Sequence, residues 1–504
     1  MRKINSLSLK RTLVAAAGAL VCLSAQAVTS VVVAPAKATI IISSRDPVGF
    51  GFNDTTPVAP VGGNPGTTLG AQRYNVYRYV ADIWEQNLQS PVDINVSAGW
   101  EALPCTANSA TLGSASAFNL WHDFPGGAPG TWYPQALANK LAGVNLSADT
   151  PDDGSGYGNV DIKTQFNINL GNPDCLSGSG FYLGFDGKAG AQVNFVATLL
   201  HELGHGLGFS VLSVNTSSGL RINAEYTAYT TTGLPSIWER FMYDNTAKKT
   251  WLTMTSAERK ASAINPLQLA WIGPNVAAAQ GLLKAQPALA IATPAPGASG
   301  LYQYNPSPFG AAITTPSALG RLAVIADQAG SLGPACAPFN AANIAAVAGK
   351  VPVISRGGCT FAIKVKNAQD AGAIGVLLAN NAAGALNPGG ADATISIPSA
   401  GITMADGDKL KAAVIAARPY GSRSAPGSVT ATWSVDTSRI AGADAQGRPL
   451  LYTPNPLIGG SSVSHWDVSA SPNLLMEPNI SSDLGIILTA PKDLTVPLLK
   501  DLGW

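Results

Sequence analysis

The sequence His201-Glu202-Leu203-Gly204-His205 limits the possible folds of this chain more than any other feature. Two histidines four residues apart on a helix lie on one face, one turn from each other, so both imidazoles can reach one metal ion. A helix is predicted over residues 192–206, because this stretch is rich in Val, Phe and Leu and ends near glycines. The carboxylate of Glu202 is placed to hold and deprotonate a water on the metal. The motif therefore predicts one catalytic Zn²⁺, with His201 and His205 as ligands and Glu202 as general base.

A third protein ligand must come from elsewhere, because a catalytic zinc site holds three protein groups and an open position for water. Gly208 follows His205 by three residues and would break the helix and turn the chain. Val211, another three residues along, cannot bind a metal ion. The third ligand is therefore expected farther along the chain.

Residues 201–209 resemble the metzincin metalloproteases, specifically their leishmanolysin-like branch. In that branch an insertion separates the glycine from the third histidine, and a methionine turn follows shortly after. Three later stretches are also similar to the family, namely Ser464-His465-Trp466-Asp467, Asn473-Leu474-Leu475-Met476-Glu477-Pro478 and the ending from Leu494 to Trp504. The resemblance implies an endopeptidase that hydrolyses internal peptide bonds of proteins by a zinc-activated water.

The resemblance also implies a ligand set. Zinc would be held by His201, His205 and His465, and Met476 would form the apolar floor beneath them. Glu225 is a competing third ligand, since it lies twenty residues after His205, similar to the zinc-binding glutamate of thermolysin-like enzymes. No strong helical pattern surrounds Glu225, so His465 is the preferred prediction.

A very long insertion lies between Phe209 and Ser464, and part of it is similar to a protease-associated (PA) domain. The similarity is strongest over residues 353–376. Strand signals alternate there with a helical one, which indicates a small α/β domain: strands near 322–326, 351–354 and 375–379, and a helix near 363–371. PA domains are non-catalytic lids or binding modules, so no catalytic residue is expected in it. The Ala/Pro-rich residues 277–300 are predicted to be a linker.

The first 27 residues are predicted to be a signal peptide. A basic start is followed by apolar residues 13–23 and by a small-residue cleavage site that ends at Ala27. The mature chain is therefore expected to be secreted or periplasmic. Its four cysteines are an even number in an exported chain and indicate two disulfides; of three possible pairings, sequence position favours Cys105–Cys175 and Cys336–Cys359.

Composition narrows the expected partners. The 504 residues include 31 basic and 30 acidic side chains, so there is no electrostatic case for nucleic acid or an anionic membrane. Apolar residues make up 46%, which is enough for at least one large core. Protein or peptide substrates are expected, and nothing in the pattern indicates an oligomeric state.

The predicted fold class is α+β. A two-lobed metzincin-like protease domain, with a twisted mixed sheet and the active-site helix, would be formed by residues 28–299 and 433–504. A small α/β PA-like domain would be inserted at residues 300–432.

Several alternatives stay open at this point. The chain could be a non-catalytic exported binding protein that uses its PA-like domain, or a zinc amidase acting on small or cell-wall peptides. His122 could belong to a second metal site, although a hydrogen bond to the neighbouring Asp123 is the simpler interpretation. Ca²⁺ at the acidic turns Asp152-Asp153-Gly154 or Asp186-Gly187 is possible but lacks a full ligand pattern. Asp467 could orient His465 or be a solvated loop residue.

Overall fold

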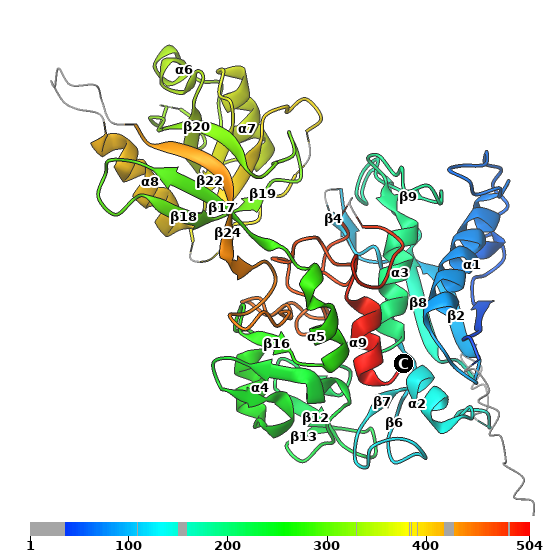
Figure 1. The fold of residues 1–504 in the computed structure, drawn as a ribbon. Helices are drawn as coiled ribbons and strands as arrows, with labels where there is room; N and C mark the ends of the chain where they lie inside the picture. The colour runs from blue at the N-terminus through cyan, green and yellow to red at the C-terminus, as the bar shows by residue number, and fades with distance from the viewer. Residues whose placement is uncertain are drawn as a thin grey trace, which may run out of the picture.

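The computed structural model describes residues 36–504, apart from residues 150–158, 418–427 and 482–483 and the single positions 108, 329, 383, 385 and 391. The predicted signal peptide and the turn at residues 152–154 lie outside the described residues. The chain forms a mixed structure of helices and several separate sheets (Figure 1). None of the described helices is long and apolar enough to cross a membrane.

A four-stranded sheet supports the helix that carries the histidine motif. Its order is β1 (Ile40–Ser44), β2 (Ile94–Glu101), β8 (Ile162–Asn167) and β5 (Gly113–Ala117). The first three strands are parallel, and β5 is antiparallel to β8 and forms the edge. Helices α1 (Leu69–Asn87) and α3 (Phe195–Gly206) contact this sheet and each other.

Local capping sets where α1 and α3 begin. The side chain of Thr68 accepts a hydrogen bond from the amide of Ala71, and that of Asn194 accepts one from Ala197. The predicted helix over 192–206 is therefore confirmed but begins three residues later, because Asn194 ends the extended segment before it.

The rest of this part consists of short elements around the same core. Its helices and 3-10 turns are η1 (Gly51–Asn53), α2 (Gln135–Ala142), η2 (Trp238–Phe241), η3 (Trp251–Thr253), α4 (Ser256–Ser262), α5 (Pro274–Ala279), η4 (Gln280–Leu282) and α9 (Thr495–Leu502). Its strands are β3 (Cys105–Thr106), β4 (Ser109–Ala110), β6 (Leu120–Trp121), β7 (Tyr133–Pro134), β9 (Phe181–Tyr182), β10 (Val193–Asn194), β11 (Val214–Asn215), β12 (Leu220–Ile222), β13 (Tyr229–Thr230), β14 (Met242–Asp244), β15 (Lys249–Thr250) and β16 (Leu269–Trp271).

A second body is built on an eight-stranded sheet. Its order is β18 (Gly300–Gln303), β17 (Ala285–Ala292), β24 (Thr430–Ile440), β20 (Ser317–Ala323), β21 (Val351–Ser355), β22 (Val376–Ala379), β23 (Ser399–Ile402) and β19 (Asn305–Pro306). One buried cluster joins the sheet to α8 (Met404–Ala416), and another joins it to α6 (Ala341–Val347) and α7 (Phe361–Asp370). Helices therefore cover both faces, as the predicted alternation of strands and helices requires.

The prediction of a linker over residues 277–300 is wrong, because this stretch contains β17, an interior strand of the eight-stranded sheet. Its Ala and Pro content indicated a linker, but its apolar residues alternate. Leu289 and Ile291 are 0% and 4% exposed and point to the same face of the sheet. Pro287 is tolerated next to a register shift in the pairing with β24.

The eight-stranded sheet is connected to the rest of the chain by two neighbouring strands. β17 and β24 are antiparallel partners, with Ala285 paired to Ile440 where the chain enters and leaves (Figure 1). The largest hydrophobic cluster contains buried residues from before and after the inserted sheet. Its last member before the insert is Leu283, and its first member after it is Leu451. Both predicted disulfides, Cys105–Cys175 and Cys336–Cys359, are confirmed.

A buried carboxylate in the first body should make its stability depend on pH. Asp161 is 0% exposed and accepts hydrogen bonds from Gln135, Asn139 and the amide of Asn95. Burial raises its pKa from 3.8 to about 6, so the folded state holds a proton that the unfolded state has lost. This contribution is complete below about pH 4, is lost as the pH rises through about 6, and amounts to about 3 kcal/mol.

We expect Asp161→Asn to remove that pH dependence. The variant should be less stable than wild type at pH 4, and the gap should narrow towards pH 7. Urea unfolding midpoints of both proteins across this range test the prediction. A gap that widens with increasing pH would contradict it.

Candidate metal centre

Three histidines from distant parts of the chain meet at one point. His201 and His205 come from α3, and His465 comes from the segment after the inserted sheet. Their Nε2 atoms are 3.1 Å apart for His201–His205, 3.1 Å for His205–His465 and 3.3 Å for His201–His465. The three side chains are 5–9% exposed. In the described part of the chain, no other set of three His, Cys, Asp or Glu side chains converges in this way.

The second nitrogen of each ring faces a backbone carbonyl. The Nδ1 atoms of His201, His205 and His465 lie 2.7, 2.7 and 2.8 Å from the carbonyl oxygens of Leu475, Phe209 and Ser461, respectively. A carbonyl oxygen can only accept, so each Nδ1 carries the proton and each Nε2 keeps its lone pair. The close Nε2 pairs are therefore not hydrogen bonds.

This donor set fits a zinc ion. Burial lowers the pKa of His201 to about 4 and that of His465 to about 3, and it lowers the pKa of His205 well below the usual value. Three uncharged rings thus direct three lone pairs at each other, and a single cation between them would be bound by all three. Tetrahedral Zn²⁺ with Zn–N bonds of about 2.0–2.1 Å holds its ligand nitrogens roughly 3.3 Å apart. The observed separations of 3.1–3.3 Å are close to this value.

Glu202 lies next to the histidines on α3 and is only partly exposed. Burial raises its pKa to about 8, although the backbone amide of Ala115 donates to it and lowers the value in part. Without a metal the carboxyl group would thus hold a proton at neutral pH. A cation held by the three histidines would favour the carboxylate, which is the form that a general base needs.

Met476 packs against α3, the helix that carries His201 and His205. It is fully buried, and a Cβ on Gly204 would lie 2.8 Å from its sulfur. Gly204 therefore leaves the space that the side chain of Met476 fills against α3. The carbonyl that accepts from His201 belongs to Leu475, so the same segment also fixes the orientation of that ring.

Asp493 holds this segment in place and was not singled out by the sequence. It is 3% exposed, and one carboxylate oxygen accepts from the Leu475 amide at 2.7 Å while the other accepts from the Thr495 amide at 2.7 Å. The bond from the Thr495 amide is local to the start of α9, but the reach of the second oxygen of Asp493 to Leu475 has no sequence signal. Asp493 thus supports His201 through the backbone of Leu475.

The competing candidates lie apart from the triad. Glu225 is exposed and does not belong to the converging group. The Nδ1 of His122 donates to a carboxylate oxygen of Asp123 at 2.6 Å, so the prediction of a hydrogen bond to that acid is confirmed. Asp467 is 6% exposed and accepts from Ser469, so it is not a solvated loop residue. The Nδ1 of His465 faces the carbonyl of Ser461 instead of Asp467, so the hypothesis that Asp467 orients this ring is wrong too.

The acidic turn at Asp186 shows no set of calcium ligands among the described residues. Its carboxylate accepts from the Tyr182 hydroxyl at 2.7 Å and from the Lys188 amide at 3.1 Å. These bonds account for the turn without an ion.

Known structures resemble only part of the chain. An aminopeptidase from Aneurinibacillus sp. strain AM-1 is 25% identical over 32% of this chain and 37% of its own, with a TM-score of 0.20. BSAP, a zinc aminopeptidase from Bacillus subtilis, is 20% identical over 33% of this chain and 37% of its own, with a TM-score of 0.20. A psychrophilic subtilisin-like protease from Pseudoalteromonas sp. AS-11 is 19% identical over 31% and 36%, with a TM-score of 0.19. This chain spans little more than a third of the length of each.

No curated protein matches the chain. The family model of the PA domain matches residues 319–410, which lie on the eight-stranded sheet and its helices and include Cys336, Cys359 and Lys364. The PA domain predicted from the sequence is therefore present.

Proposed function

We propose that the chain is an exported zinc-dependent endopeptidase of the metzincin type. His201, His205 and His465 would bind the ion, and Glu202 would act as general base. The observation that carries the proposal is the convergence of three buried Nε2 lone pairs within 3.3 Å, next to a carboxyl group of raised pKa.

Each residue has a defined task in this reaction. A zinc ion held by the three histidines would lower the pKa of a bound water and would polarise a carbonyl. The carboxylate of Glu202 takes a proton from the attacking water and passes it to the leaving nitrogen of the peptide bond. The carbonyls of Leu475, Phe209 and Ser461 keep the histidine Nε2 atoms free of protons.

The edge strand β5 offers a place for an extended substrate. The amide of Ala115 in β5 donates to Glu202, which places this strand beside the general base. Among the described strands, β5 has a single partner, β8, and thus an open edge. A peptide that pairs with that edge would pass the metal with chain on both sides, which favours endopeptidase over exopeptidase action.

The proposal includes an arrangement of domains. After removal of residues 1–27, the protease domain predicted at residues 28–299 and 433–504 would give up β17 and most of β24, because both strands belong to the eight-stranded sheet. The PA-like domain predicted at residues 300–432 would extend over these two strands and would bind or shield substrates. Binding of protein substrates by this domain rests on analogy alone.

Metal content and cleavage profiling test the proposal together. Purified mature chain should contain one zinc per molecule and should make new internal cuts in a proteome-derived peptide library, with loss of both after chelation and recovery with Zn²⁺. Trimming from peptide amino termini alone would replace the endopeptidase by an aminopeptidase. A folded, zinc-loaded chain that makes no cuts would favour the binding-protein alternative.

Asp493→Ala should weaken metal binding without removing a ligand. The amide of Leu475 would lose its partner, and the carbonyl of the same residue would no longer hold the His201 ring in place. Loss of such outer-shell support costs about 10- to 100-fold in metal affinity. Competition with a zinc chelator measures this, and Asp186→Ala, at an acidic turn without such a link to the triad, is the matched control. Unchanged zinc affinity in a folded Asp493→Ala would refute the positioning role.

A further inference from the structure

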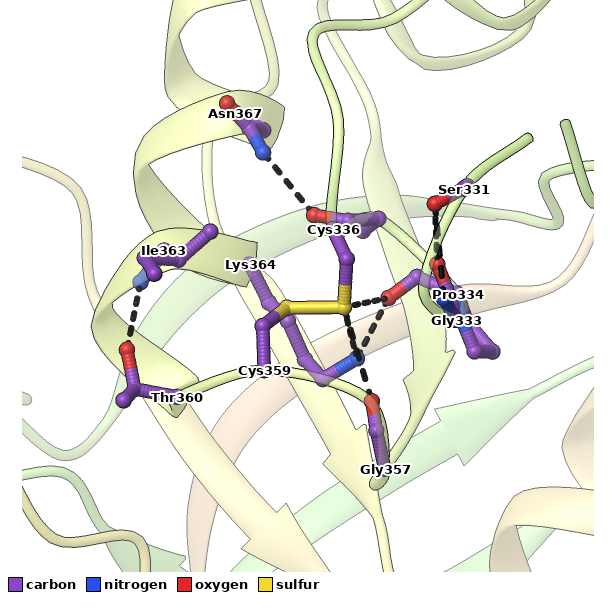
Figure 2. The surroundings of a disulfide bond; sticks show 11 residues. Ser331, Gly333, Pro334, Cys336, Gly357, Cys359, Thr360, Ile363, Lys364 and Asn367 are labelled. Atoms are coloured by element: carbon purple, nitrogen blue, oxygen red, sulfur yellow. Dashed lines mark hydrogen bonds between the residues drawn. A yellow bond between two sulfur atoms is a disulfide. The ribbon is translucent and has the colours of Figure 1, made fainter.

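The disulfide between Cys336 and Cys359 has an unusual neighbour, the side chain of Lys364 (Figure 2). Cys336 lies in the loop between β20 and α6, and Cys359 lies just before α7, whose first turns include Lys364. The lysine is 0% exposed. Its Nζ donates to the carbonyl of Pro334 and lies 3.5 Å from the sulfur of Cys336.

The charge of this lysine is poorly compensated. Burial lowers the pKa of Lys364, and the negative charge of Asp327 raises it by less. Ion pairs in the described ranges include Lys366 with Asp370 on the same helix but none with Lys364. Since burying an ammonium group without a counter-ion is costly, a negative charge formed next to Lys364 would be stabilised.

Only one of the two sulfurs has this environment. Among the described contacts, Nζ meets the sulfur of Cys336 and not that of Cys359 (Figure 2). The carbonyl oxygens of Pro334 and Gly357 lie 3.7 and 3.5 Å from the same sulfur. If the disulfide opened, a Cys336 thiolate could therefore accept a hydrogen bond from the ammonium group of Lys364. A Cys336 thiol could instead donate to either of the two carbonyl oxygens.

The chain around the other cysteine is the more exposed of the two. Cys359 is partly exposed, and its chain neighbours Gly358 and Thr360 are exposed. Cys336 is also partly exposed, but it follows the buried Ala335 and packs beside the lysine. Access and leaving-group chemistry thus favour the same direction of attack, because a disulfide opens faster when the departing sulfur is the better-stabilised thiolate.

We infer that this disulfide is a thiol-exchange site, at which an external thiolate attacks Cys359 and Cys336 departs. The new bond joins the sulfur of the incoming monothiol to that of Cys359, and the bond between Cys359 and Cys336 breaks. Its electron pair stays on Cys336, beside the ammonium group of Lys364. The product is a mixed disulfide on Cys359 and a free Cys336, so the step needs no oxidant or reductant besides the thiol.

The second disulfide of the chain is an internal comparison. Cys175 is 1% exposed, and the polar group near its sulfur is the neutral amide of Asn167 at 3.5 Å. Cys105 is partly exposed between the exposed Pro104 and Thr106, but the described contacts of this disulfide include no charged group, so charge does not favour exchange at Cys105–Cys175. The structure therefore assigns the exchange to one of two disulfides and to one of its two sulfurs.

Mapping of adducts tests the inference on the full mature chain. The protein is treated with glutathione as the monothiol probe, quenched with N-ethylmaleimide and digested for mass spectrometry. We expect glutathione on Cys359 and maleimide on Cys336 in at least fivefold excess over the reverse, while Cys105–Cys175 stays intact. Adducts shared equally, adducts mainly on Cys336, or earlier opening of Cys105–Cys175 would overturn the inference.

Two variants isolate the lysine. Lys364→Met should slow the exchange roughly three- to tenfold, since the departing thiolate loses its stabilising charge. Lys366→Met, at a partly exposed lysine of the same helix, should exchange at the wild-type rate. Equal rates for Lys364→Met and wild type would overturn the role of Lys364. If circular dichroism shows that Lys364→Met is unfolded, the adduct ratio of the wild-type chain decides alone.

Discussion

Glu202→Gln is expected to lower kcat/KM for peptide hydrolysis by about 1000-fold while zinc stays bound. Glutamine keeps the size of the side chain and an oxygen that can accept from the Ala115 amide, but it cannot take a proton from water. General base catalysis contributes about 10²- to 10⁴-fold to such reactions. The measurement is kcat/KM on a substrate found by cleavage profiling, with zinc content determined on the same samples.

Measuring activity and zinc content together shows whether Glu202→Gln loses the proton transfer or loses the metal. Glu225→Gln is the matched control, since Glu225 is exposed and outside the triad, and it should keep wild-type activity. A fully active Glu202→Gln with bound zinc would rule out Glu202 as the base. A variant that has lost zinc would show instead that the carboxylate helps to hold the metal.

His465→Ala is expected to lower zinc affinity by at least about 100-fold and to abolish cleavage. Removing one of three ligands leaves two histidines, and outer-shell losses alone already cost 10- to 100-fold. Zinc should then no longer raise the melting temperature at concentrations that stabilise wild type, because ligand binding to the folded state is the source of that shift. Chelator competition and thermal unfolding with and without Zn²⁺ measure both effects.

His122→Ala is the control for His465→Ala, because His122 is hydrogen-bonded to Asp123 and lies outside the converging group. It should bind zinc like wild type. Full zinc binding by His465→Ala, combined with loss of zinc in Glu225→Ala, would show that the ligand set is wrong.

The sequence alone predicted only the part of the candidate site that lies within one short segment. The pair His201 and His205 is separated by one helical turn, so a single periodicity brings both rings to one face. His465 lies 260 residues beyond His205, and only the resemblance to metzincins connected them. Asp493 and the carbonyl of Leu475 act through backbone atoms, for which no residue type is diagnostic.

For the fold, too, the sequence predicted elements that form within one segment but not those that depend on distant partners. Helix α3 and the alternating elements of the PA domain follow from patterns of apolar residues within single segments. The strand β17 was missed because its Ala and Pro content indicates a linker, and its stability comes from pairing with β24, more than a hundred residues away. Pairing partners of that separation leave no mark within a short window of sequence.

The pairing of Ala285 with Ile440 changes what the length of the insertion means for folding. Closing a chain loop costs entropy that grows slowly with length, by about 0.6 kcal/mol for each doubling. Once β17 and β24 have paired, the intervening residues act on the remaining chain as a hairpin of fixed, short span. The segment with His465 then has to search little more space than it would after a tight turn. The number of residues between His205 and His465 therefore overstates the length of chain that must be closed into a loop when the metal site forms.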